Sequence, residues 1–436
     1  MSDWTFGELK KWDDKIRAIA ESYNLDWHPI NYEICDYYEM IGNMSYHGLP
    51  SHYSHWSFGK SFERTHQLYN AGMEGLPYEL IINSNPSIAY LMRENPLYLQ
   101  ILIMAHCVGH SDFFKNNRLF QETRPESVNS RFRNAKKRIQ EYVEDPNIGQ
   151  RKVEAFIDNV HSIRYQTERN GLKRRTKQEI KQSHVDIINS DKHDNFNKFV
   201  DLERPLLEPD KDLLGFLIEN GTHFRDWQID ILNIVKDESQ YFIPQIKTKI
   251  INEGHASFWH YKILNELDLP QKFYIPFIKS HNQVVRPHIG GINPYHIGFH
   301  IYKKVEEKFG LDECLFIREV MSDESAIMNY LDRDDFRELN LFSFSTKREY
   351  ISIDEISDED GWKEVRSNFI KSIGVNGIPS IYVTDLASTG ELILKHDFDG
   401  RELNLDFSEN VVKNIRAIWP GKVKLFTVLE DESWEI

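Results

Sequence analysis

Apolar residues recur at helical spacing over most of the first 345 residues. In residues 8–24 they return every three or four positions, which predicts an amphipathic helix. Residues 96–114 form a longer, almost continuous apolar run that contains His106 and His110. A helix that is apolar on every side is buried, so this run predicts a core helix that ends near residue 116.

Other stretches of the body give shorter signals. Residues 78–83 are apolar and predict a strand or the start of a helix, and Ser84-Asn85-Pro86 after them predicts the start of another helix. Residues 211–268 predict three helices, the last from about 243 to 267. Residues 281–300 combine histidine, glycine and proline and predict a loop before a further helical region.

The last ninety or so residues differ from the rest. Four segments predict a strand, a second strand, a helix and a third strand, namely residues 380–385, 391–396, 408–418 and 423–428. The pattern therefore predicts a mainly α helical body, residues 1–345, and a small C-terminal α+β domain, residues 346–436.

Residues 122–200 stand out within the body because charged side chains dominate and apolar positions are sparse. This composition predicts a charged arm of helices with solvated faces. The sequence leaves open whether the arm binds a partner or is only an exposed part of the fold.

Charge and cysteine usage exclude several classes of protein. Lys and Arg number 53 against 68 Asp and Glu, a net charge of -15, which argues against general nucleic-acid binding because such proteins neutralise phosphates. The three cysteines are far apart in sequence, which argues against a disulfide framework and favours a reducing cytoplasm. The N-terminus lacks the pattern of a signal peptide. No apolar run approaches the ~20 residues of a membrane span.

The histidine pair in the core helix is the main sign of chemistry. His106 and His110 are four residues apart, so a helix presents both imidazoles on one face. Glu253, on the last helix of region 211–268, could add an oxygen ligand. Two histidines, one carboxylate and an open position form a catalytic zinc or ferrous iron site, and we take zinc as the first choice.

The residue that would activate water is less evident. Zinc proteases with an H-E-x-x-H helix use its glutamate as general base, but Cys107 occupies that position here. We therefore predict Glu33 as the base, and His55 or His260 as the group that stabilises an oxyanion or orients a ligand. A histidine pair can instead serve packing alone. A di-iron site is disfavoured because the expected pair of Glu-x-x-His motifs is missing.

Several strings together resemble the SpoVR-like family (stage V sporulation protein R). They include Tyr32-Glu33-Ile34, His55-Trp56-Ser57-Phe58-Gly59-Lys60, Gly109-His110-Ser111-Asp112-Phe113-Phe114, Asn252-Glu253-Gly254 and His396-Asp397-Phe398-Asp399-Gly400-Arg401. The resemblance covers essentially the whole chain. The family usually has a large aromatic residue where this chain has His255, and the role of that histidine stays open.

The resemblance implies a link to spore cortex formation or to a stress response. It also implies two partners, a PrkA-type serine kinase/AAA+ protein and a von Willebrand-like protein. Three hypotheses follow. The first is a zinc-dependent hydrolase of amide bonds in peptide or peptidoglycan-type substrates. The second is a non-catalytic adaptor of the PrkA-type system, and the third is a non-haem iron oxygenase. The sequence does not select the substrate, the metal or the oligomeric state.

Overall fold

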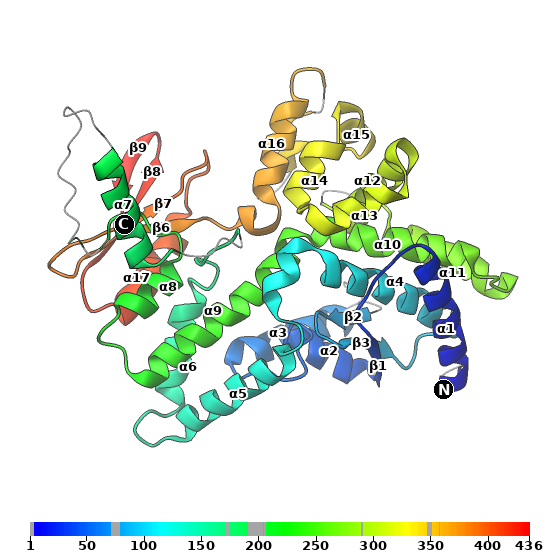
Figure 1. Cartoon of the computed structure of the whole chain (residues 1–436), viewed down its shortest axis with the longest axis horizontal. Helices are drawn as coiled ribbons and strands as arrows, with labels where there is room; N and C mark the ends of the chain where they lie inside the picture. Colours follow the sequence, from blue (N-terminus) through cyan, green and yellow to red (C-terminus); the bar gives the residue numbers. More distant parts are fainter. Residues whose placement is uncertain are drawn as a thin grey trace. The chain divides into compact units, whose positions relative to one another are not determined.

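A computed structural model describes most of the chain, and its described residues form two compact units (Figure 1). The described residues are 4–70, 79–170, 175–190, 204, 206–288, 291–346, 351–356 and 358–436. Unit 1 comprises Met1–Gln140 and Pro244–Gly377, and unit 2 comprises Glu141–Ile243 and Ile378–Ile436. Whether residues 1–345 and 346–436 are separate domains stays a prediction.

Unit 1 is mainly helical, as predicted. Its helices are α1 (Phe6–Ser22), α2 (Tyr37–Ser45), α3 (Trp56–Asn70), α4 (Leu97–Asn116), α10 (Lys249–Glu266), α11 (Gln271–Val284), α12 (Pro294–Phe309), α13 (Leu311–Val320), α14 (Asp323–Tyr330), α15 (Arg333–Glu338) and α16 (Trp362–Ser372), with short 3-10 helices at Arg118–Thr123 and Gly374–Gly377. Two helices, α5 (Val128–Glu144) and α9 (Asp226–Lys247), have residues in both units.

A three-stranded sheet lies within the first ninety or so residues. Its order is β1 (Ile30–Cys35), β3 (Ser87–Met92) and β2 (Glu79–Ile82), with β1 parallel and β2 antiparallel to β3. The prediction that Ser84-Asn85-Pro86 begins a helix is wrong, because the residues after it form β3. As the central strand, β3 reads as one apolar run without alternation, and such a run cannot be told from a buried helix by its period. A separate hairpin joins β4 (Ser343–Thr346) to β5 (Ile351–Glu355).

The core helix α4 confirms the prediction for residues 96–114. All of its residues from Leu99 to Phe114 are buried. It packs closely on α10 because Gly109 faces Ala256, and a methyl group on Gly109 would come within 2.7 Å of the Ala256 Cα. The close approach of these two helices brings the side chains of the candidate site together.

The helices after residue 243 depart from prediction in two places. The predicted helix from 243 to 267 is divided at Thr248, where α9 ends and α10 begins. The division has a visible cause, since Asp323 accepts hydrogen bonds from the backbone N–H groups of Ile250 and Ile251 and so caps a new helix start.

The predicted loop at 281–300 is too long at both ends, because only the stretch between α11 and α12 lies outside a helix. His281 lies in α11 and His296 lies in α12. Helix α12 begins with Pro294 in its first turn, and the Asn293 side chain accepts a hydrogen bond from the backbone N–H of Tyr295. Proline in a first turn favours a helix start, so its presence did not indicate a loop.

Unit 2 contains the predicted C-terminal sheet. Its strands pair in the order β6 (Ile381–Leu386), β7 (Leu392–His396), β8 (Val423–Leu429) and β9 (Glu432–Glu435). Its helices are α6 (Gln150–His161), α7 (Lys177–Ser190), α8 (Leu213–Asn220) and α17 (Leu405–Ile418). The sequence did not predict β9, whose four side chains are all exposed and show no apolar alternation.

The predicted charged arm, residues 122–200, forms regular helices where it is described. Helix α6 buries Val153, Phe156, Ile157 and Val160 on one face, as an amphipathic helix does. Residues 171–174 and 191–200 of this region lie outside the described residues. In the part of the chain that the structure describes, no helix has the length and apolar character needed to cross a bilayer.

Candidate metal centre

Helix α4 presents His106 and His110 side by side, as their spacing predicts. The two ring centroids are 4.6 Å apart, and both side chains are buried. Because α4 is apolar around its whole circumference, the surrounding side chains keep bulk water away from the two rings.

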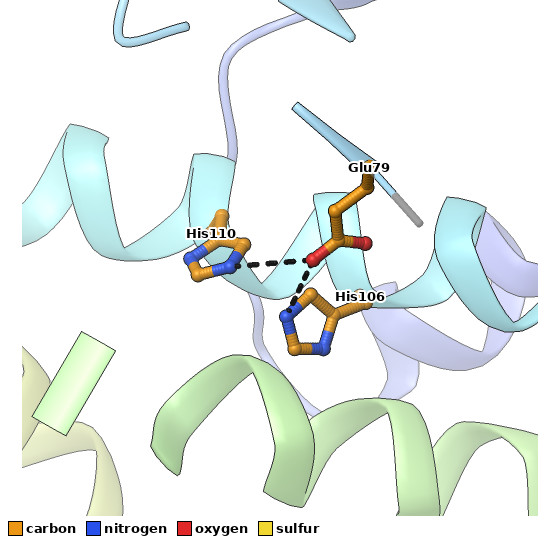
Figure 2. A group of neighbouring side chains, drawn as sticks. All are labelled: Glu79, His106 and His110. Carbon is orange, nitrogen blue, oxygen red and sulfur yellow. Dashed lines mark ion pairs between the residues drawn. The ribbon is translucent and has the colours of Figure 1, made fainter. Parts of the chain in front are cut away.

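Glu79, the first residue of β2, supplies a carboxylate that the sequence analysis did not identify. Its Oε1 lies 2.9 Å from Nε2 of His106 and 3.8 Å from Nε2 of His110. Figure 2 shows both imidazoles turned toward this oxygen. The ligand atoms of these three residues all lie within 4.8 Å of one another, so Glu79, His106 and His110 could hold a metal ion.

Glu253 of α10 approaches the same point. Its Oε2 lies 3.8 Å from Nε2 of His106 and 3.4 Å from Nε2 of His110. Ligands of a tetrahedral ion with bonds of about 2.0–2.1 Å lie roughly 3.3–3.4 Å apart. The four nitrogen–oxygen distances, 2.9 to 3.8 Å, fall on both sides of that separation.

Two of these ligand-type atoms are buried without a hydrogen bond. Among the described residues, Nε2 of His106 and Oε2 of Glu253 lack any partner with hydrogen-bond geometry, although each has an atom of opposite charge nearby. Buried polar atoms without a hydrogen-bond partner are rare, because they lose their hydrogen bonds to water and gain none in the folded protein. Atoms that face a common point rather than one another are arranged as metal ligands are.

The charges at this point are not balanced by protein groups alone. Burial lowers the pKa of His106, but the nearby carboxylates of Glu79 and Glu253 outweigh burial and raise it to about 9. Burial raises the pKa of Glu253, but the close approach and charges of His106 and His110 outweigh it and lower that pKa below its ordinary value. A divalent cation would neutralise both carboxylates and replace the proton on His106.

A phenol lies beside the same carboxylates. Burial, followed by the charges of Glu253 and Glu79, raises the pKa of Tyr295 well above its ordinary value. Its ring centroid is 6.2 Å from that of His106. Tyr295 therefore stays protonated and can donate a hydrogen bond at the edge of the site.

The second nitrogen of each histidine has a partner that fixes the ring. Nδ1 of His110 lies 2.9 Å from Oδ1 of Asn252, so it donates and leaves Nε2 with a free lone pair. Nδ1 of His106 lies 2.8 Å from Nδ1 of His260. Such outer contacts orient metal-bound histidines and select their tautomer.

The contact with His260 continues to a third histidine. Nε2 of His260 lies 2.8 Å from Nδ1 of His281. Burial lowers the pKa of His260 well below its ordinary value, and burial, followed by the charge of His106, lowers that of His281 to about 4. Both rings are therefore neutral at pH 7. His260 contacts His106 directly, and its role at the site stays a prediction.

Glu33, the predicted general base, lies on β1 opposite Tyr90, and Tyr90 lies opposite Leu80 on β2. Side chains of paired residues share one face of a sheet, and neighbours along a strand point to opposite faces. Glu33 and Leu80 therefore point to the same face. Glu79 directly precedes Leu80 in β2, so its side chain points to the opposite face from that of Glu33. This placement gives no support to Glu33 as the base.

The other two predicted or open histidines make local contacts. Nδ1 of His55 lies 2.7 Å from Oγ of Ser57, at the start of α3, and its role at the site stays a prediction. Nε2 of His255 donates to Oδ2 of Asp112 at 2.7 Å, and both side chains are completely buried. His255 is thus tied to a carboxylate two positions beyond His110 in α4.

The missed residues left only weak signals in the sequence. Glu79 is the one acidic residue in the apolar stretch 78–83, and an isolated charge in a buried strand is a sign of a functional site. His281 was assigned to a loop, and Asn252 is a neutral amide next to a charged residue. Glu79 reaches the histidines only because β2 pairs with β3, and Asn252 reaches them only because α10 packs on α4.

Comparison with known proteins identifies the family. The sequence model described as SpoVR like protein matches residues 3–378. The chain belongs to the SpoVR-like family. It is also similar to the uncharacterized protein YcgB of Escherichia coli (strain K12), with 33% identity over 483 aligned positions that cover 100% of this chain and 94% of YcgB. No solved structure matches the chain significantly.

Proposed function

We propose that this SpoVR-like protein is a metal-dependent hydrolase with one zinc ion bound by Glu79, His106 and His110, and that Glu253, predicted as a ligand, instead faces the open position of the zinc. The observation that carries the proposal is that carboxylate oxygens of Glu79 and Glu253 each lie 2.9 to 3.8 Å from Nε2 of His106 and of His110, in a largely buried place where two of these atoms lack a hydrogen bond. A zinc ion would supply both the missing positive charge and the polarisation of a bound water or carbonyl group.

The protein groups have separate parts in this proposal. Oε2 of Glu253 lies 3.8 and 3.4 Å from Nε2 of His106 and of His110, so this carboxylate could accept a proton from a water bound at the open position. Glu253 then takes the place of Glu33 as base. Tyr295, which stays protonated, would donate to the oxygen on which negative charge develops.

The substrate class is proposed from the family resemblance. An association with the spore cortex favours amide bonds of peptide or peptidoglycan-type substrates. The partners implied by the resemblance, a PrkA-type serine kinase/AAA+ protein and a von Willebrand-like protein, remain predictions, as does a location in the cytoplasm.

A non-haem iron oxygenase is the second candidate. Two histidines and one carboxylate on one side of an open position are the ligand set of such oxygenases, and Glu79, His106 and His110 supply that set. The identity of the bound metal and the dependence on oxygen separate this candidate from the hydrolase. The adaptor hypothesis needs no metal at all.

Elemental analysis tests the proposal directly. Untagged protein purified without chelator should contain about one zinc per chain, and the His106→Ala/His110→Ala variant should contain none while keeping its helical circular dichroism. His396→Gln is the matched control, since His396 is also buried but bonds to Thr427 in unit 2. Iron in place of zinc would favour the oxygenase, and a wild-type chain without metal would contradict both.

A further inference from the structure

Three buried imidazoles form a continuous hydrogen-bonded chain that leads away from the metal centre. His106 Nδ1 and His260 Nδ1 are 2.8 Å apart, and His260 Nε2 and His281 Nδ1 are also 2.8 Å apart. The side chain of His260 is completely buried and that of His281 is 2% exposed. The His281 ring is flanked by Tyr261 and Phe299, with centroids 4.8 and 4.9 Å away, which limits its rotation.

The hydrogen bonds between the three imidazoles can run in one of two directions. A neutral imidazole carries one N–H, so His260 must donate through one nitrogen and accept through the other. In the outward direction, a neutral His106, as in the metal-bound state, donates to His260 and His260 donates to His281, which leaves Nε2 of His106 without a proton. In the inward direction the protons run the opposite way, and Nε2 of His106 carries a proton that blocks metal binding.

We propose that His260 and His281 are positioning residues of the metal centre, and that they hold His106 in the tautomer that presents its Nε2 lone pair to the metal. This inference rests on the proposed metal site. His281 is linked to the proposed metal site only through His260 and His106. Because it is the last acceptor, it fixes the outward direction of the hydrogen bonds between the three imidazoles.

Replacing His281, the last acceptor, should reverse the direction of the hydrogen bonds between the imidazoles. Without His281, the N–H on Nε2 of His260 would be buried and unpaired, a state that costs about 1–3 kcal/mol. His260 avoids this cost by moving its proton to Nδ1, where His106 can accept it. His106 is then driven to the tautomer with a proton on Nε2, which competes with the metal.

The test measures Zn²⁺ affinity by competition with a chromophoric chelator. His281→Phe should weaken Zn²⁺ binding by about 10–100-fold, the range seen when an outer partner of a ligand is removed. His281→Gln keeps a carbonyl acceptor for His260 and should recover most of the affinity. His396→Phe removes a buried histidine of unit 2 and should leave Zn²⁺ affinity unchanged.

The outcomes separate the two proposals. If the wild type binds no Zn²⁺ at this site, the metal centre itself is wrong. If the wild type binds and a folded His281→Phe variant binds equally well, only the positioning role is wrong. Should His281→Phe not fold, ¹⁵N NMR of the Zn²⁺-loaded wild type decides. The ring of His281, assigned with His281→Gln, must carry its proton on Nε2, and a proton on Nδ1 overturns the proposal.

Discussion

Helices α4 and α10 enclose two polar clusters only a turn or so apart, and the carboxylates of the two clusters differ in their partners. At the first, Glu79, His106, His110 and Glu253 converge, yet Nε2 of His106 and Oε2 of Glu253 have no hydrogen bond. At the second, both oxygens of Asp112 accept hydrogen bonds, Oδ2 from His255 and Oδ1 from Arg318 and the backbone of Asp26.

The comparison separates a structural carboxylate from a candidate ligand. Asp112 is 0% exposed and its negative charge is matched by the guanidinium of Arg318, so this carboxylate is satisfied as it stands, although His255 Nδ1 and Arg318 Nε have no hydrogen bond. The carboxylates of Glu79 and Glu253 both lie near the imidazolium of His106, and among the described residues no lysine or arginine forms an ion pair with either of them. The Asp112 carboxylate is fully buried and both of its oxygens are hydrogen-bonded, whereas the side chains of Glu79 and Glu253 are 16% and 17% exposed and Oε2 of Glu253 has no hydrogen bond.

The largest expected effect is on Asp112. Asp112→Asn leaves Arg318 without its buried carboxylate partner and with only the half-exposed Glu319, which should lower the free energy of unfolding by about 3 kcal/mol. Urea denaturation of metal-free protein measures this loss. Asp334→Asn, whose side chain is 80% exposed, serves as the control and should change stability by less than about 0.5 kcal/mol.

The stability of the metal-free protein should fall with rising pH. The pKa of His106, about 9 in the folded chain, exceeds that of an unfolded histidine, about 6.5. Its contribution is therefore complete below pH 6.5 and is lost as the pH rises through 9, a loss of roughly 3 kcal/mol.

Denaturation in chelator at pH 6.5 and pH 9.5 measures this loss. His106→Gln should remove most of the difference, and Zn²⁺ should remove it in the wild type. If the free energy of unfolding of His106→Gln falls by the same amount between these two pH values, the pH dependence arises from other groups.

The approach of α4 to α10 should be sensitive to one methyl group. Gly109→Ala places a carbon within 2.7 Å of the Ala256 Cα, so the helices must separate at a cost of about 1–3 kcal/mol. Zn²⁺ affinity should fall with stability, because the change moves Glu253 away from the histidines. Gly59→Ala is the control, since Gly59 is also helical and a methyl group there has no neighbour within 4 Å.

The smallest expected change in stability is that of Glu79→Gln, a variant that should no longer bind the metal. Glu79→Gln leaves Glu253 paired with the His106 imidazolium, so the metal-free protein should change by about 1 kcal/mol or less. Zn²⁺ binding should nevertheless be lost, as measured by titration calorimetry. If Asp112→Asn and Glu79→Gln affect stability and metal binding to the same degree, the distinction between the two clusters does not hold.

Local pattern was enough to predict part of this arrangement. The spacing of His106 and His110 and the apolar run around them predicted a buried histidine pair on one helix, and the structure confirms that helix. Glu253 was named from its helix and lies within 3.8 Å of both histidines. The C-terminal strands with apolar alternation were predicted too, whereas the exposed β9 was not.

The rest depends on contacts between distant segments. Glu79 reaches the histidines only because β2 pairs with β3, and β3 was itself predicted as helical. The face of the sheet on which Glu33 lies follows from strand register, which no local pattern specifies. His281 joins His260 across 21 positions of sequence, in a segment predicted as a loop.

The most direct test is a crystal structure of the chain grown with Zn²⁺, with anomalous diffraction recorded at the zinc absorption edge. The account predicts one anomalous peak about 2.0–2.2 Å from Nε2 of His106, Nε2 of His110 and a carboxylate oxygen of Glu79. The Asp112 cluster should show none. A zinc-loaded crystal without a peak among these three residues would contradict the central claim.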